Sequence, residues 1–248
     1  MSDWERRRRQ FRSDGFVVLE RIIADRDLCA LRDECQRFID QKDREMDAAG
    51  KGVLGLDQRG KRYFVNDCST ISPVLRRFVL GDLMAEISGA LLGDDVFLFN
   101  DQYVVKGAEV GTRFAWHQDS GYVGYPHPPY LTCWCALDDM REENGTVHLL
   151  PHERAGTREV VAHRRDESSN DLVGYEGPDP GIAVEVPAGS IACFSSTVFH
   201  RSGPNTTSAL RRAYIVQYSP EPILLADRSR LRHQAVPLIR GGALATGG

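Results

Sequence analysis

From residue 96 onward, short apolar runs alternate with turn-forming residues. The runs lie at 96–99, 103–105, 130–137, 146–150, 182–186, 190–194 and 213–218. They are rich in β-branched and aromatic residues, and Gly, Pro, Asn and Asp separate them, which is typical of β-strands joined by turns. Seven such strands favour a sandwich or jelly roll over a parallel sheet with alternating helices.

The first 95 residues show helical periodicity instead. One apolar face recurs every three or four positions, at Leu28, Leu31, Cys35, Phe38 and Ile39. Two more helices are expected, one starting at Ser72-Pro73 and one ending at Gly93, and a short strand is expected at 16–19. The glycine-rich stretch 43–66 predicts a long loop, either solvated or a mobile lid, and 158–181 predicts a second long loop.

These patterns predict a mainly β fold with flanking α-helices. No linker composition divides the chain, so we expect one domain over 1–248. It would consist of a helical part at about 1–95, a barrel core at about 96–218 and a C-terminal tail at 219–248. The glycine-rich end, 241–248, is expected to be frayed.

Composition narrows the class of protein. The net charge is −4, which gives no general attraction for polyanions, so we expect no nucleic-acid partner. The arginine run 6–9 indicates a solvated helix start, with a nucleic-acid or anionic-lipid arm as the alternative. No apolar stretch has the length of a membrane span and no secretory signal is evident, so we expect a cytoplasmic protein without a membrane partner. Six cysteines without a CxxC pair fit buried thiols in a reducing compartment.

One short motif carries metal-binding chemistry. In Trp116-His-Gln-Asp119, an extended backbone would place His117 and Asp119 on the same face, where both could bind one metal ion. His200, which follows a predicted strand, can supply a third ligand. Two imidazoles and one carboxylate form the facial triad of non-haem Fe(II) oxygenases, which leaves positions open for a co-substrate and dioxygen.

A positively charged side chain follows this triad along the chain. Arg211 comes eleven residues after His200, so a hairpin of two short strands would return it toward the metal. A guanidinium grips a carboxylate through two parallel hydrogen bonds, as a dicarboxylate co-substrate requires. The neighbouring Arg212 should point to the opposite face, so spacing alone leaves open which of the two arginines faces the metal.

Five motifs occur in the order of a known family. They are WHQD at 116–119, NG at 144–145, PAGS at 187–190, HRSGPNTT at 200–207 and LRR at 210–212. Through them the chain resembles the phytanoyl-CoA dioxygenase family of Fe(II)/2-oxoglutarate oxygenases. The resemblance implies a double-stranded β-helix, a cupin-like jelly roll, and hydroxylation of an unactivated C–H bond with release of succinate and CO2.

The resemblance also implies roles for single residues. Iron would be bound by His117, Asp119 and His200. The co-substrate 2-oxoglutarate would contact Arg211, Ser202, Trp134 and Gln102, and dioxygen would be the second co-substrate. Asp119 stands where related halogenases have Gly or Ala, which favours hydroxylation or another oxidation over halogenation.

One position departs from the family pattern. Arg154 in Pro151-His-Glu-Arg154 replaces a usual histidine. We expect this change to alter the substrate side or the surroundings of the ligands, and not the metal.

Four residues are candidates for the substrate side. Tyr122 follows the metal motif and could face the substrate. His127 lies in a proline-rich turn and is either exposed or a substrate contact. His148 could face the barrel interior from a strand, and Arg62 could reach the pocket from its loop or remain solvated. We expect a small metabolite or natural-product intermediate as substrate.

Two other functions are compatible with the same ligands. A zinc or manganese isomerase could use this triad, although nothing in such an enzyme would require Arg211. A binding module that retained the fold without catalysis is the third possibility.

Overall fold

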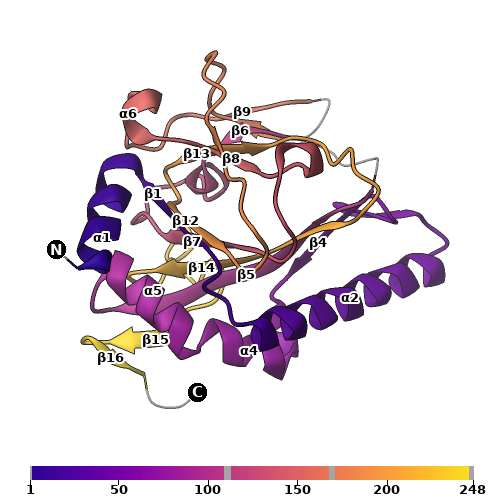
Figure 1. Cartoon of the computed structure of the whole chain (residues 1–248), viewed down its shortest axis with the longest axis horizontal. Coiled ribbons are helices and arrows are strands. Elements are labelled where there is room, and N and C mark those ends of the chain that lie inside the picture. The colour runs from indigo at the N-terminus through magenta and orange to yellow at the C-terminus, as the bar shows by residue number, and fades with distance from the viewer. Residues whose placement is uncertain (1, 109–112, 168–170, 246–248) are drawn as a thin grey trace.

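The computed structural model describes residues 2–108, 113–167 and 171–245. Two antiparallel sheets face one another (Figure 1). The large sheet has the order β1 (Phe16–Leu19), β12 (Ile191–Ser195), β7 (Leu131–Ala136), β14 (Arg211–Ser219), β5 (Val96–Lys106), β4 (Arg62–Asn66), β3 (Asp57–Gln58) and β2 (Val53–Leu54). β15 (Val236–Arg240) also pairs with β5 and with β16 (Ala243–Leu244). The small sheet has the order β11 (Ile182–Ala183), β8 (Val147–Leu150), β13 (Phe199–Ser202) and β6 (Phe114–His117).

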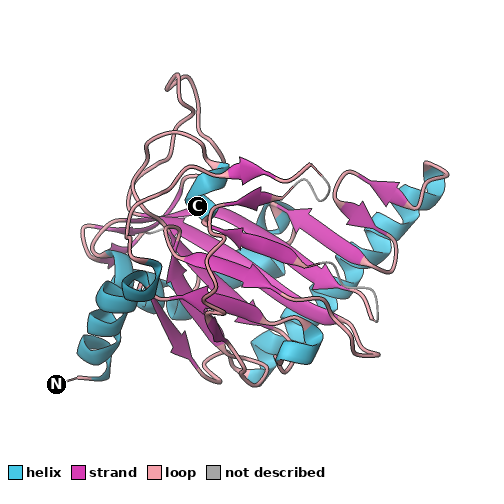
Figure 2. Ribbon diagram, turned by 90° about the horizontal axis from the view of Figure 1, so that it is seen from above, coloured by secondary structure: helices cyan, strands magenta, loops and turns pink. Residues whose placement is uncertain are grey.

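Helices cover the outer face of the large sheet. They are α1 (Asp3–Asp14), α2 (Asp25–Ala48), α3 (Cys68–Ile71), α4 (Pro73–Val79) and α5 (Asp82–Leu92). In Figure 2 the broad array of strands lies in front of the long helix. The remaining short elements are α6 (His152–Ala155), η1 (Asp119–Tyr122), η2 (Glu142–Asn144) and a separate pair, β9 (Arg164–Arg165) with β10 (Leu172–Val173).

Alternation along the strands separates two cores. Cys133 and Cys135 of β7 point outward and join the cluster formed with the buried face of α2. Trp134 and Ala136, at the positions between and after them, point inward and pack against residues of the small sheet such as Leu149. Because neighbours on a strand leave opposite faces, the same strands supply the helix-packed core and the space between the sheets.

The predicted β-sandwich is confirmed, as are the helix over 28–39, the Ser72 cap and the strand at 16–19. The prediction of a loop over 43–66 is wrong. Helix α2 continues to Ala48, and β4 pairs with β5 over five positions. Tyr63 and Val65 of β4 are buried, and this alternation holds the strand against the sheet although glycines precede it.

Regular structure begins and ends close to both limits of the described residues. The arginine run 6–9 lies in α1, which Ser2 caps, and Arg7 pairs with Asp3 at 2.7 Å. Part of the predicted frayed end forms β16, while 246–248 lie outside the described residues. The predicted loop 158–181 contains β9 and β10, and its residues 168–170 also lie outside that description.

Two further expectations concern the burial of the cysteine thiols and the presence of membrane-spanning helices. All six cysteines are free, and five of them are buried, with Cys29 exposed. None of the described helices combines the length and apolar character needed to cross a membrane.

Candidate metal centre and co-substrate pocket

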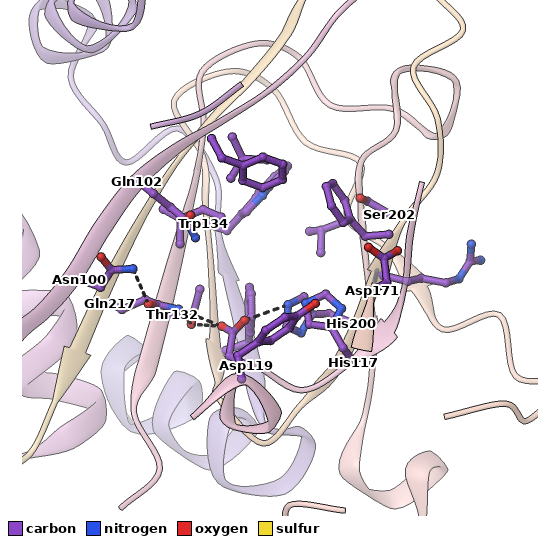
Figure 3. Close-up of a pocket in the computed structure, with 18 of the residues that line it drawn as sticks. Asn100, Gln102, His117, Asp119, Thr132, Trp134, Asp171, His200, Ser202 and Gln217 are labelled. Atoms are coloured by element: carbon purple, nitrogen blue, oxygen red, sulfur yellow. Dashed lines mark hydrogen bonds and ion pairs between the residues drawn. The ribbon is translucent and has the colours of Figure 1, made fainter. Parts of the chain in front are cut away.

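A cavity of about 410 Å3 lies between the two sheets (Figure 3). Alternate positions of adjacent strands form its floor: Asn100, Gln102 and Val104 on β5, Thr132 and Trp134 on β7, and Arg211, Ile215 and Gln217 on β14. Strand register places these side chains in cross-strand rows, such as Ile215 beside both Gln102 and Trp134. The floor of the cavity is therefore built into the regular part of the large sheet, while loop residues such as Arg232 complete its wall.

The three predicted metal ligands converge on the small-sheet side of this cavity. His117 at the end of β6 is the cross-strand partner of His200 on β13, and the two imidazole centroids lie 4.1 Å apart. Asp119 begins η1, and its Oδ1 lies 3.4 Å from Nε2 of His200. One ligand atom from each residue lies within 4.8 Å of the others, as the ligands of a single ion must.

Backbone carbonyls fix the orientation of both imidazoles. Nδ1 of His117 lies 2.8 Å from the carbonyl oxygen of Ala115, and Nδ1 of His200 lies 3.1 Å from that of Val198. A carbonyl oxygen only accepts, so Nδ1 carries the proton in each ring. Each Nε2 is then left with a lone pair, which is the arrangement of a metal-ligating histidine.

The electrostatics of the cluster favour the protonation states that metal ligands need, a neutral imidazole and an ionised carboxylate. Burial, together with the neighbouring His200, lowers the pKa of His117 to about 3, so its imidazole is neutral at pH 7. Burial alone would raise the pKa of Asp119, but the adjacent His200 and further hydrogen bonds lower that pKa to about 2. A neutral imidazole beside an ionised carboxylate is ready to accept a divalent cation without first losing protons.

A chain of hydrogen bonds orients the carboxylate of Asp119 through Oδ2, the oxygen that does not face the imidazoles. The hydroxyl of Thr132 donates to Oδ2 at 2.6 Å, and Nε2 of Gln217 donates to the same oxygen at 3.1 Å. Asn100 Nδ2 in turn donates to Oε1 of Gln217 at 3.2 Å (Figure 3). Oδ2 is thus occupied by two donors, and Oδ1 is the oxygen that faces the imidazoles.

Replacing Gln217 with leucine is expected to weaken iron binding by about 10-fold, because Oδ2 of Asp119 loses one of its two donors and the carboxylate can rotate. The dissociation constant for Fe(II), measured anaerobically by calorimetry, checks this. The control is Tyr218→Phe on the opposite face of the same strand, which removes only a hydrogen bond to the Val79 carbonyl. Equal iron affinities for wild type and Gln217→Leu would contradict the role of Gln217.

The opposite end of the cavity carries the predicted cation. Arg211 is 2% exposed, and its guanidinium lies 5.8 Å from the ring of Trp134. It donates to the carbonyl oxygens of Gly145 at 3.2 Å and Val104 at 3.4 Å, while its Nε is buried without a partner. A buried guanidinium with an unsatisfied donor fits an incoming carboxylate. Arg212 points to the other face, as predicted, and pairs with Asp138 at 2.6 Å.

A lysine that the sequence did not single out lies beside this arginine. Lys106 is the cross-strand partner of both Arg211 and Arg62, so three basic side chains form one row across β14, β5 and β4. Its Nζ lies 2.8 Å from Oγ of Ser202 and also contacts the carbonyl oxygen of Gly203. Burial, reinforced by the charge of Arg211, lowers the pKa of Lys106 to about 6.

This lowered pKa predicts a pH-dependent stability. The unfolded chain binds a proton at Lys106 up to its ordinary pKa of 10.5, whereas the folded chain has released it above about pH 6. The free energy of unfolding therefore rises with pH in this window, by about 2 to 3 kcal/mol from pH 7 to pH 9. Lys106→Met should lack this increment, measured by urea unfolding without co-substrate, whereas exposed Lys51→Met should keep it. An identical pH dependence in Lys106→Met would show that the lysine is charged in the fold.

The remaining co-substrate candidates also line the cavity. Ser202, Trp134 and Gln102 do so, the first from β13 beside Lys106 and the other two from the floor (Figure 3). Two substrate-side candidates line it as well. The ring of Tyr122 lies 5.4 Å from that of His117, and Arg62 reaches the wall from β4 while its Nε donates to the Leu56 carbonyl.

Three positions lie outside the cavity wall. His148 is buried in β8 beside Arg201 and Glu142, and His127 packs on the ring of Tyr130, 5.5 Å away. The expectation that His148 faces the cavity is therefore not met, because its side chain leaves the other face of β8. Arg154 pairs with Asp179, with Nε 2.8 Å from Oδ2, and does not line the cavity either.

Comparison with known proteins is consistent with this geometry. The model of the phytanoyl-CoA dioxygenase (PhyH) family matches residues 11–213. L-proline trans-4-hydroxylase of Streptomyces griseoviridis is 25% identical over 83% of this chain and 82% of its own. Ectoine dioxygenase of Bordetella bronchiseptica is 25% identical over 84% of this chain and 73% of its own.

Solved structures share the fold. The epimerase SnoN from nogalamycin biosynthesis, described in complex with Fe3+, alpha ketoglutarate and nogalamycin RO, has a TM-score of 0.67 at 21% identity, covering 98% of this chain and 96% of its own. EvdO2 from Micromonospora carbonacea var. aurantiaca, complexed with 2-oxoglutarate, has a TM-score of 0.69 at 22% identity, covering 92% and 94%. These likenesses confirm the predicted cupin-like jelly roll. Since the family model covers most of the chain, the protein belongs to the phytanoyl-CoA dioxygenase family.

Proposed function

We propose that the protein is an Fe(II)- and 2-oxoglutarate-dependent dioxygenase that hydroxylates a C–H bond of a small molecule. One observation carries the proposal. The triad of His117, Asp119 and His200 shares a single cavity with Arg211, whose buried Nε has no partner. The volume of about 410 Å3 suits 2-oxoglutarate together with a small metabolite, and the relatives named for L-proline and ectoine point to substrates of that size.

The side chains present fit the groups that this function needs. His117, Asp119 and His200 would hold the ferrous ion, Arg211 and Ser202 would hold the distal carboxylate of 2-oxoglutarate, and Trp134 and Gln102 would line its site. When bound, ferrous iron and 2-oxoglutarate supply the oxidising power for C–H cleavage with dioxygen, and the co-substrate leaves as succinate and CO2.

The chain itself would bind, orient and exclude water. Nδ1 of each histidine stays on its backbone carbonyl, so the lone pairs keep their direction throughout turnover. Apolar side chains such as Phe99, Phe194 and Ile215 form the rest of the wall, which keeps bulk water from the reacting centre. The proposal requires no side chain to act as nucleophile or general base.

Succinate formation tests the proposed function. With Fe(II) supplied, purified protein is expected to convert 2-oxoglutarate to succinate only when oxygen is present, slowly alone and faster with its substrate. Mass spectrometry of the substrate should show the gain of one oxygen atom, which separates hydroxylation from the epimerisation and ring closure named for structural neighbours. Absence of oxygen-dependent succinate under all conditions would refute the proposal.

Metal analysis distinguishes the non-oxidative alternative. A zinc or manganese isomerase would retain its activity when oxygen and 2-oxoglutarate are removed. We expect the opposite, because a buried guanidinium is costly to desolvate and non-oxidative isomerisation does not require a carboxylate on Arg211. Protein purified without chelators is expected to contain iron, and thermal stabilisation by 2-oxoglutarate is expected to require metal.

A further inference from the structure

The charge of the cavity wall is opposite in sign to that of the whole chain. Among the described residues, the arginines of the cavity wall are Arg62, Arg165, Arg211 and Arg232. Arg201 also borders the cavity, but its guanidinium lies over the ring of Trp116 and donates to the Pro180 carbonyl, on the outer face of the small sheet. The carboxylates that line it are those of Asp119 and Asp171. The chain as a whole carries a net charge of −4, so positive charge is concentrated where a small molecule would enter.

Iron and co-substrate do not neutralise this excess. Ferrous iron adds two positive charges and 2-oxoglutarate adds two negative ones, so the pair leaves the balance of the wall unchanged. Under the proposed function, Arg211 pairs with the co-substrate and Asp119 with the metal. More cations than carboxylates then remain on the substrate side, and a low-dielectric cavity strengthens their attraction for an anion.

Arg232 has the hydrogen-bonding capacity that such an anion needs. One terminal nitrogen donates to the carbonyl oxygen of Tyr122 at 3.2 Å, and its Nε is buried without a partner. No carboxylate among the described residues forms an ion pair with it. A guanidinium that lines a cavity with a buried, unsatisfied N–H lacks an acceptor, and an anionic ligand would supply one.

The backbone around Arg232 keeps it in place. Its amide donates to the Ile223 carbonyl at 2.8 Å, and the amide of Gln234 donates to the Phe99 carbonyl at 2.9 Å. The segment is therefore attached to β5 at Phe99, directly before Asn100, which lines the cavity. Arg232 is thus held at a defined position and does not lie on a detached tail.

Arg232 lies on the substrate side of the metal ligands. Tyr122, which accepts its hydrogen bond, ends the helical turn that Asp119 begins, and its ring contacts His117. Beside it, the rings of Phe99 and Tyr130 lie 4.9 Å apart and form an apolar wall. A molecule with an anionic end on Arg232 could therefore rest its hydrocarbon part on these rings and present it to the triad.

We propose that the substrate is a small organic anion, a carboxylate or a phosphate monoester, whose charged group is bound by Arg232. This inference rests on the proposed function and names the class of molecule oxidised at the same site. The guanidinium fork would bind two oxygens of the anion, and the apolar wall would take the C–H bonds next to it.

Calorimetry with paired probes tests the proposal. The protein is first loaded anaerobically with Fe(II) and with saturating 2-oxoglutarate, so that Arg211 is occupied. It is then titrated separately with hexanoate, hexyl phosphate and hexanamide. We expect at least one anion to bind about 10- to 100-fold more tightly than the amide, as loss of a charge-assisted hydrogen-bond pair implies. Tighter binding of hexanoate would indicate a carboxylic acid, and tighter binding of hexyl phosphate a phosphate ester.

Variants assign the preference to Arg232. In Arg232→Gln the anion and the amide should bind with equal affinity. Arg232→Lys should restore part of the difference in affinity between anion and amide. The affinity for 2-oxoglutarate should remain unchanged in both variants. Arg230→Gln is the matched control, because Arg230 is an exposed residue of the same loop and does not line the cavity. Failure of both anions to bind wild type, or an equal preference in Arg232→Gln and Arg230→Gln, would overturn the inference. The proposed function would survive either result as long as oxygen-dependent succinate is formed.

Discussion

Asp119→Ala is expected to abolish oxygen-dependent succinate formation and to weaken Fe(II) binding by more than about 100-fold. The change removes one of three ligands, and among the described residues the cluster contains no other carboxylate. Loss of residues that merely orient a ligand costs 10- to 100-fold in metal affinity, so loss of the ligand itself should cost more. Anaerobic calorimetry with Fe(II) and a succinate assay measure the two effects separately.

The same variant also leaves two donors without their acceptor. Thr132 and Gln217 both donate to Oδ2 of Asp119, and the cavity beside them gives water access, so the fold should persist. The control is His148→Gln, which changes a buried histidine of the small sheet that does not line the cavity, and this variant should bind iron normally. Full iron affinity in Asp119→Ala would show that the carboxylate is not a ligand.

The pairing of His117 with Asp119 was predictable from sequence because Gln118 between them has an extended backbone, although Asp119 itself begins the turn η1. Spacing after His200 pointed to Arg211 or Arg212, and the family resemblance favoured Arg211. The same reasoning could have found Gln217, which shares parity with Arg211 on β14, and Thr132, which shares parity with Trp134 on β7. Polar residues at inward positions of otherwise apolar strands were the available signal.

Other features depended on long-range pairing that no local pattern shows. From sequence, Lys106 looks like an ordinary residue at the end of a strand. Only its register with Arg211 and Arg62 shows that three basic side chains form a row. Strand β4 lay within a glycine-rich stretch, and its pairing with β5 outweighed the local tendency to form a loop. Arg232 follows the predicted core, in a segment whose attachment to Phe99 is a tertiary contact.

Arg211→Met is expected to raise the dissociation constant for 2-oxoglutarate by about 100-fold or more and to change Fe(II) affinity by less than about 3-fold. The guanidinium is buried at the end of the cavity away from the triad, so its loss removes a charge-assisted pair without touching the ligands. Burial lowers the pKa of Arg211 to about 10, which shows the cost of desolvating this charge. The co-substrate-free variant should therefore unfold at a temperature equal to or above that of wild type.

Thermal unfolding with and without 2-oxoglutarate checks this prediction in the presence of metal. Wild type should be stabilised by the co-substrate, and Arg211→Met should not be at the same concentration. Arg212→Met is the matched control, since Arg212 pairs with Asp138 on the opposite face of β14. That variant should lose stability but keep its affinity for 2-oxoglutarate, because its side chain does not reach the cavity. Equal loss of iron and 2-oxoglutarate binding in Arg211→Met would assign the arginine to the fold instead of to the co-substrate.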